Sequence, residues 1–355
     1  MCVPPPALDN DPAFQHACYM DPQTKEHITK ARALLATVAA ADGWKMHSSS
    51  KGVKVETLAV EGDPLPATRG SGIVDAGVEE FIRCVRSAGA RKIWDPRFED
   101  GHLVRHLGGN NNTLFSRIPG IMKVVAPRFI YGVQQRYYLP STDTHVVLIT
   151  SLPASEKDAP LPKGYVAVNV KFAAWYLTPL ETGASPQTQI VYYSWVDPCG
   201  TIPPALVKLV STQAGMCVAT VRDYLVEFGA PLGVSAVGWI LIDRFEFEHK
   251  TRAYDFIASL SDHVTDEQVR ETYMEINIDP KMYPSGVVFS QKGADLTDVD
   301  CVMVKNGRSE TNRWVKVRFS NAKWRGTIMV VCTKRKSGDF KMTINDKVMD
   351  EVDSF

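Results

Sequence analysis

The sequence has no excess of charge of either sign. Its 40 lysine and arginine residues equal its 40 aspartate and glutamate residues, so the formal net charge is zero. A general nucleic-acid-binding protein normally carries a basic excess or a dense basic face. We therefore expect no nucleic acid among the partners, although local basic clusters can still contact anionic lipid headgroups.

Long apolar runs are also missing. No stretch approaches the ~18 uninterrupted apolar residues that indicate a membrane-spanning helix. Residues Met1 to Asp21 lack a basic segment followed by an apolar one, which argues against a secretory signal. We expect a cytoplasmic protein that meets membranes only at their surface.

The patterns of metal sites and of common enzymes are absent as well. The seven cysteines are odd in number and none has CxxC spacing, which is typical of free thiols in a reducing compartment. His102, His106 and His145 are spaced too irregularly for a zinc motif. No nucleophile elbow, phosphate-cradling loop or dinucleotide fingerprint occurs. We expect no catalytic residue, no metal and no cofactor.

What is present is a globular composition, with 45% hydrophobic residues in 355, which suggests two domains. Residues 1–23 are interpreted as a leader and residues 24–230 as a first domain. A linker is expected over residues 231–238. Residues 239–350 alternate between short apolar runs and turn residues, which predicts a smaller β-rich domain.

The first domain begins and ends with a predicted helix. Apolar residues recur at three- and four-residue steps from Thr24 to Ala41, and a wide apolar face runs from Pro203 to Phe228. Three strands, a helix over Gly77 to Ala88 and a series of six strands up to Asp197 lie between them. The hairpin-like turns predict one antiparallel, strongly twisted sheet.

Five motifs occur in this order along the first domain. They are Gly43-Trp44-Lys45, Lys92-Ile93-Trp94-Asp95-Pro96, Pro127-Arg128-Phe129, Trp175-Tyr176-Leu177-Thr178-Pro179-Leu180, and Asp197-Pro198-Cys199-Gly200-Thr201-Ile202-Pro203. In this combination, residues 24–230 resemble the START family (steroidogenic-acute-regulatory-protein-related lipid transfer). The family usually has an aspartate where this chain has Phe129. Its sterol-binding members have a buried acid–arginine pair, and Gln134 stands where the arginine falls.

The resemblance implies an α+β helix-grip fold, in which a curved antiparallel sheet wraps a long last helix and leaves a hydrophobic tunnel. It implies non-enzymatic binding of one lipid (a phospholipid, a sphingolipid or a sterol) and its transfer between membranes. Two alternatives stay open. One is a lipid-sensing adaptor whose C-terminal domain binds a protein partner, and the other is an enzyme, since related helix-grip folds include cyclases and hydrolases. The C-terminal domain resembles no family.

Strand alternation and the helical face supply the candidate lipid-binding residues. They are Phe115, Arg117, Tyr131, Val133, Gln134, Val147, Ile149, Val168, Val170 and Tyr193 on strands, and Leu209, Gln213 and Cys217 on the last helix. Ordinary core packing is the alternative for each of them.

The segment between Ile118 and Pro127 is the candidate membrane gate. It joins two strands, yet it is more apolar than a loop in water normally is. Pro119-Gly120 suits a hinge, and Lys123 is placed to meet a phosphate. The predicted gate residues are Ile118, Ile121, Met122, Lys123, Val124 and Val125. The resemblance implies that this loop contacts the membrane and opens the tunnel, whereas simple packing on the core is the alternative.

Overall fold

The structure is a computed structural model. It describes residues 20–63, 65–108, 111–121, 124–154, 161–180, 186–200, 203–260, 264–292, 299–305, 313–319, 326–344, 347–348 and 351–352. The chain forms two compact units. Unit 1 comprises Met1–Ile82 and Lys92–Tyr224, and unit 2 comprises Arg83–Arg91 and Leu225–Phe355. A short segment from the first half of the chain therefore belongs to the C-terminal unit. The predicted leader falls almost entirely outside the described residues.

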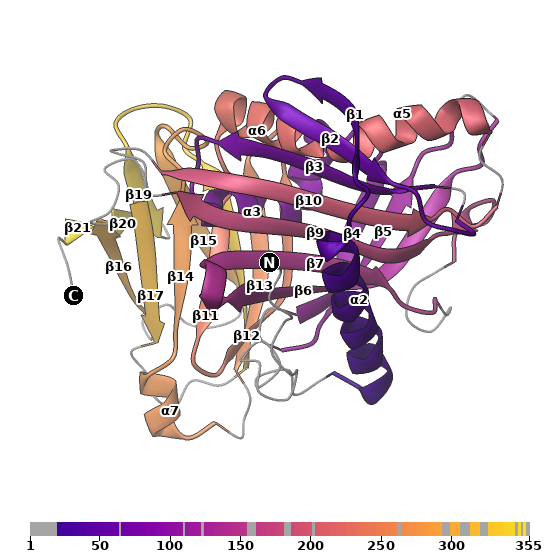
Figure 1. Cartoon of the computed structure of the whole chain (residues 1–355). Coiled ribbons are helices and arrows are strands. Elements are labelled where there is room, and N and C mark those ends of the chain that lie inside the picture. The colour runs from indigo at the N-terminus through magenta and orange to yellow at the C-terminus, as the bar shows by residue number, and fades with distance from the viewer. Residues whose placement is uncertain are drawn as a thin grey trace. The chain divides into compact units, whose positions relative to one another are not determined.

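Unit 1 is built on a ten-stranded sheet with the order β1-β2-β3-β10-β9-β7-β6-β5-β4, in which all neighbours on this path are antiparallel and β8 pairs in parallel with β6 (Figure 1). The strands are β1 (Lys45–Ser50), β2 (Val53–Leu58), β3 (Ala67–Val74), β4 (Asp100–His106), β5 (Asn111–Ile118), β6 (Arg128–Leu139), β7 (Thr144–Ser151), β8 (Val166–Ala167), β9 (Asn169–Leu180) and β10 (Gln187–Asp197). A 3-10 turn, η2 (Pro140–Thr142), joins β6 to β7.

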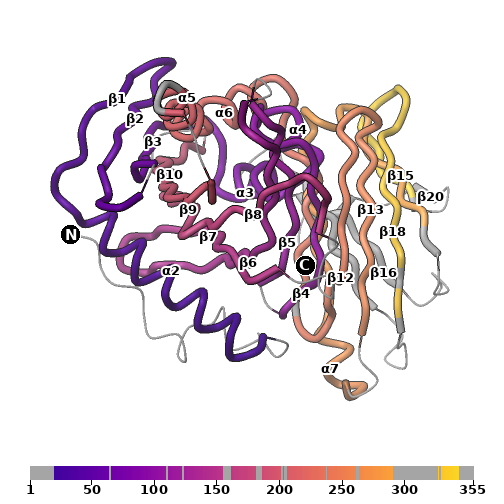
Figure 2. Tube along the Cα trace, turned by 90° about the vertical axis from the view of Figure 1, so that its right-hand side faces the viewer, coloured from indigo at the N-terminus to yellow at the C-terminus, as the bar shows by residue number. Residues whose placement is uncertain are grey.

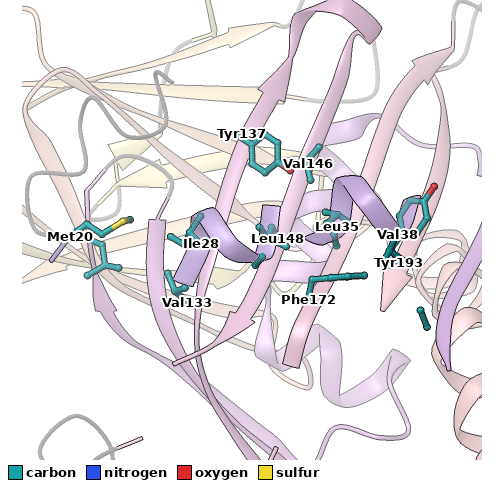
Figure 3. Packing of buried hydrophobic residues seen from close by; sticks show 14 residues of the cluster. Met20, Ile28, Leu35, Val38, Val133, Tyr137, Val146, Leu148, Phe172 and Tyr193 are labelled. Carbon is teal, nitrogen blue, oxygen red and sulfur yellow. The ribbon is translucent and has the colours of Figure 1, made fainter. Parts of the chain in front are cut away.

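Helix α2 (Pro22–Ala40) packs on β6, β7 and β9. It begins after Asp21, whose side chain accepts a hydrogen bond from the Thr24 backbone N–H at 2.9 Å and so caps the first turn. Its apolar side is buried against the sheet, as the cluster in Figure 3 shows. The members of this cluster are Met20, Ile28, Ala31, Leu35, Val38, Ala67, Leu107, Val133, Tyr137, Val146, Leu148, Phe172, Ala174 and Tyr193.

The opposite side of the sheet is covered by helix α5 (Pro204–Gly215), which packs on β2, β3 and β10. Figure 2 shows α2 and α5 on different sides of the sheet. A Cβ on Gly70 of β3 would lie 2.1 Å from the Gly215 oxygen, so the helix backbone lies directly on the strand. Gly70 pairs with Tyr192, while its neighbour Arg69 pairs with Tyr193 of the α2 cluster. We call the two sides of the sheet the α2 face and the α5 face.

The last helix is not continuous, in contrast to the single helix predicted over Pro203–Phe228. It divides at Met216 into α5 and α6 (Cys217–Phe228). The division follows Gly215, where a Cβ would lie 2.5 Å from Val55 Cγ1. A residue without a side chain allows the helix to touch the sheet and weakens it at the same place.

Two further helices lie among the described residues of the first half of the chain. They are α3 (Val78–Arg86), which was predicted, and α4 (Ala88–Trp94), which was not. Both cross from one unit into the other along the chain, because Arg83–Arg91 belongs to unit 2.

Besides the segment Arg83–Arg91, the described part of unit 2 contains two sheets and a short helix. One sheet has the order β11-β14-β17-β16-β21 and the other the order β12-β13-β18-β15-β19-β20. The strands are β11 (Gly233–Val237), β12 (Ile240–Glu248), β13 (Ala253–Leu260), β14 (Tyr273–Ile278), β15 (Gly286–Lys292), β16 (Val299–Lys305), β17 (Arg313–Phe319), β18 (Gly326–Lys334), β19 (Lys341–Ile344), β20 (Lys347–Val348) and β21 (Glu351–Val352).

Two predictions for this region need correction. The expected linker, residues 231–238, contains strand β11, because its backbone pairs with β14. The helix expected over Thr265–Met274 is only α7 (Asp266–Arg270). Thr265 does cap it in a capping box, but Tyr273 and Met274 already belong to β14.

Candidate functional site

An apolar cluster lies on the α5 face, where several side chains remain partly accessible. Three of its members are buried, namely Ile130, Val168 and Val170. Four partly buried side chains pack against them: Leu114, Ile118, Ala173 and Val196. These seven residues, which we call the α5-face cluster, come from β5, β6, β9 and β10 and from the residue between β8 and β9. Apolar side chains on inner strands of a sheet are normally covered completely, so this cluster is suited to receive an apolar ligand.

Five of the predicted strand residues lie on the α5 face. Val168 and Val170 belong to the α5-face cluster. Ile149 is partly buried and stands opposite both Ala173 and Gln134 in neighbouring strands, so all three share a face. Val147 is fully buried two residues away on the same face.

The other five predicted strand residues lie on the α2 face, away from the α5-face cluster. Val133 and Tyr193 belong to the α2 cluster, and Figure 3 shows them beside the helix. Phe115 of β5 stands opposite Tyr131 of β6, which lies two residues from Val133 and therefore on the same face. Phe115 and Tyr131 form a separate buried cluster with Phe129. The guanidinium of Arg117 donates to Asp100 at 2.8 Å on the same face.

The physical reason for this division is the two-residue period of a strand. Both faces of the central strands carry buried apolar side chains, so the sequence does not mark which face is which. Val146 and Val147 are both fully buried although they point to opposite faces.

The three predicted residues of the last helix have different surroundings. Leu209 is 43% exposed and Gln213 is partly buried, whereas Cys217 is buried. The Cys217 thiol donates to the Gln213 carbonyl at 3.4 Å and accepts a hydrogen bond from Arg97 Nη2 at 2.7 Å.

Arg97 was missed by the sequence reasoning, although it directly follows the Trp94-Asp95-Pro96 motif. Its Nε donates to Asp95 Oδ1 at 3.2 Å, and Asp95 is almost completely buried. Burial is the largest single influence on the pKa of this guanidinium and lowers it, but Asp95 together with Cys217 and Tyr192 raises it above its usual value. The motif therefore fixes a charged side chain against the start of α6.

A packed group of aromatic rings fills another part of the α5 face. The ring of Trp175 lies 4.2 Å from that of Tyr192, 5.2 Å from that of Phe81 and 6.3 Å from that of Trp94, measured between centroids. Through these ring contacts, α3 and α4 cover Trp175 of β9 on this side of the sheet. The partly accessible α5-face cluster lies further along the same strands, toward Val170 and Val196.

Buried polar side chains also lie on the α5 face of β5 and β6. Asn112 and Gln134 stand opposite each other and are 2% and 6% exposed. Ser116 is buried opposite Ile130 of the cluster. Arg128 begins β6 opposite Ile118, and its side chain is described further below.

The predicted gate is described in part. The Ile121 N–H donates to the Val125 carbonyl at 3.1 Å, and the Val125 N–H donates to the Ile121 carbonyl at 3.0 Å, which closes a tight loop. Val125 is buried, whereas Val124 is 66% exposed. Ile118 packs on the α5-face cluster. Met122 and Lys123 lie outside the described residues.

No group of three or more histidine, cysteine or acidic side chains in the described parts of the chain is placed to hold a metal ion. No helix there has the length and apolar character needed to cross a membrane.

Comparison with known proteins identifies the family. A family model described as the START domain matches residues 26–226. The chain belongs to the START family. The match extends from α2 to α6 and contains all five motifs quoted above, and the α+β helix-grip fold predicted from the sequence is confirmed.

Solved START structures resemble this START domain. Human StAR-related lipid transfer protein 5 matches at 20% identity with a TM-score of 0.51, covering 57% of this chain and 95% of its own. Human STARD10 matches at 18% identity with a TM-score of 0.48, covering 59% of this chain and 82% of its own.

A curated plant relative is similar over part of its length. The protein named ENHANCED DISEASE RESISTANCE 2-like from Arabidopsis thaliana is 28% identical over 163 residues. The alignment covers 43% of this START protein and 22% of the plant protein.

Proposed function

We propose that the START domain of this protein binds a single lipid over the α5-face cluster and carries it between membranes without making or breaking covalent bonds. Membership of the family supports this proposal, and the observation that carries it is the partial accessibility of Leu114, Ile118 and Ala173 on inner strands of the sheet. Solid packing at these positions would leave no place for a lipid tail.

The hydrophobic effect gives the scale of the interaction. Covering about 500 Å² of lipid tail at ~25 cal/mol/Å² contributes roughly 12 kcal/mol before the entropic costs of binding. A bilayer already shelters the same tail, so this energy keeps the lipid out of water during transit and does not drive its extraction. Carriage of this kind requires an apolar site and no catalytic group.

The loop between Ile118 and Pro127 is proposed as the part that meets the membrane. The loop carries the exposed Val124, and its base carries Ile118, which is a member of the α5-face cluster. An apolar side chain of the loop that enters the lipid surface is thereby only a few residues from the proposed tail site. This short path is suited to couple membrane contact to opening of the site.

The experiment is to purify the full chain, extract it with organic solvent and identify bound lipid by mass spectrometry. One lipid per chain, moved from donor to acceptor vesicles, is the expected result. Binding without movement would favour the lipid-sensing adaptor, with the C-terminal unit as the part that meets a partner. Conversion of the bound species would favour an enzyme, and the absence of any lipid would contradict the proposal.

A matched pair of substitutions separates the two faces. Ala173→Phe adds a ring on the α5 face at a partly accessible position, so we expect at least about a tenfold loss of bound lipid with little change in stability. Ala174→Phe adds the same ring on the fully buried α2 face and should lower the free energy of unfolding by about 1–3 kcal/mol. Lipid content and urea unfolding are measured for both. Equal lipid loss in the two variants would contradict the assignment of the α5 face.

A further inference from the structure

Arg128 is a buried cation at the start of β6. It is 7% exposed, and it lies on the α5 face because it stands opposite Ile118 and two residues before Ile130. Burying a charge is costly unless another charge or several hydrogen bonds compensate it. The partners of this guanidinium therefore decide what the residue does.

Among the described residues, the hydrogen bonds of the Arg128 guanidinium go to backbone carbonyls, and the Cys199 side chain lies near enough to interact with it electrostatically. Arg128 Nε donates to the Pro198 oxygen at 3.3 Å and its Nη1 donates to the Ala126 oxygen. No carboxylate of the described residues forms an ion pair with it, and burial lowers the pKa of Arg128. Other partly buried arginines of unit 1 do have carboxylate partners, namely Arg69 with Glu56, Arg97 with Asp95, and Arg136 with Glu79.

We propose that Arg128 binds the phosphate of an anionic lipid headgroup whose tail lies over the α5-face cluster. This inference rests on the proposed lipid-binding function and adds the class of lipid. Along β6, Arg128 is about 7 Å from Ile130, since a strand rises ~3.4 Å per residue. A charged headgroup on Arg128 would thus leave its first tail carbons beside Ile118 and Ile130. The two carbonyls hold the guanidinium in place, and its remaining N–H groups supply donors for phosphate oxygens.

The surroundings favour a net negative headgroup over a zwitterionic one. A choline group would need a carboxylate or an aromatic cage beside the phosphate site. The α5-face cluster contains only aliphatic side chains, and no acidic partner of Arg128 lies among the described residues. An anionic phospholipid supplies a negative charge to the buried guanidinium without adding an unpaired positive charge, as a choline group would.

In the test, the full chain is mixed with phosphatidylcholine vesicles in which 10% of the lipid, by design, is labelled. The labelled lipid is either phosphatidic acid or phosphatidylcholine. Bound label is counted after the protein is separated from the vesicles. Both lipids offer a phosphate to Arg128, but only phosphatidic acid brings no second cation into the site, so the native chain should prefer phosphatidic acid by about tenfold or more. Arg128→Met should lose this preference but still take up phosphatidylcholine, and Arg128→Lys should keep part of it. Arg117→Met, on the opposite face, should behave like the native chain.

The outcomes distinguish this inference from the function on which it rests. If the native chain binds no lipid, the proposed function fails. If it binds both lipids equally, the function stands and the role of Arg128 is overturned. Inorganic phosphate, added without vesicles, tests whether a free phosphate is the ligand of Arg128. A free phosphate would be assigned, and the headgroup proposal overturned, if phosphate stabilised the native chain against heat but not Arg128→Met, and if the native chain showed no lipid preference. Should Arg128→Met fail to fold, the preference of the native chain and of Arg128→Lys decides.

Discussion

At the scale of the single residue, Val124 combines high exposure with an apolar side chain. Transferring a valine side chain into an apolar phase contributes about 1.5 kcal/mol, which corresponds to roughly tenfold in a binding constant. We expect Val124→Asp to slow lipid transfer between vesicles by at least about tenfold, because the gate loop then no longer enters the membrane surface. The rate is measured with a fluorescent lipid that moves from donor to acceptor vesicles.

Ile73→Asp is the matched control for Val124→Asp. Ile73 is 54% exposed on β3, so this variant adds the same charge at another exposed apolar position, and both variants should fold. A transfer rate that falls equally in the two variants would show that net charge, and not the gate loop, limits transfer.

The sequence did not separate the two faces of the sheet. The ten predicted strand residues divide equally between the α5 face and the α2 face, since both faces carry apolar side chains. Arg97 and Arg128 were not selected, although both stand within or beside quoted motifs. Their importance lies in what surrounds them, namely Asp95 and Cys217 in one case and backbone carbonyls in the other. Such contacts form between segments that are distant in sequence.

At the scale of the element, the closest approach of a helix to the sheet occurs at Gly70. A Cβ there would lie 2.1 Å from the Gly215 oxygen, and a backbone atom cannot rotate away as a side chain does. We expect Gly70→Ala to lower the free energy of unfolding by about 2 kcal/mol or more, because α5 must move off β3. Urea unfolding measures this loss.

Gly72 provides the comparison on the same face of the same strand. A Cβ at Gly72 would lie 3.2 Å from a Val53 methyl group and 3.3 Å from the Gly52 oxygen, contacts that need shifts of only a few tenths of an ångström. Gly72→Ala should therefore cost less than about 1 kcal/mol. If the two alanines cost the same, the contact between Gly70 and Gly215 does not position the helix.

Elements were predicted well where the apolar period was long, and less well at their interruptions. The helix from Pro22 to Ala40 and the strands of the sheet follow clear periodicity. The break between α5 and α6 was not predicted. Gly215 indicates a weak point in a helical pattern, but the sequence does not show that a strand packs against it there. Strand β11 was read as a linker because only its pairing with β14 makes it a strand.

At the scale of the whole molecule, the compact units do not follow the chain. The family match ends at residue 226, yet Arg83–Arg91 belongs to the unit formed by the last 131 residues, Leu225–Phe355. Arg83 Nη1 donates to the Asn277 carbonyl at 3.1 Å, and Ala90 is completely buried. Local sequence patterns cannot reveal such an assignment, because the segment keeps its helical pattern wherever it packs.

A fragment of residues 1–230 should therefore be less stable than the full chain, although it contains the entire family match. It lacks the strands that cover residues 83–91, and the loss of about 2 kcal/mol would lower its melting temperature by roughly 4–8 °C. The control is Gly89→Ala, made in both the fragment and the full chain. A Cβ on Gly89 would lie 1.8 Å from the Phe247 oxygen, so the substitution should destabilise the full chain strongly and the fragment hardly at all. An equal effect of Gly89→Ala in both would mean that packing on the C-terminal unit does not stabilise this segment, and the two units would then be independent in stability.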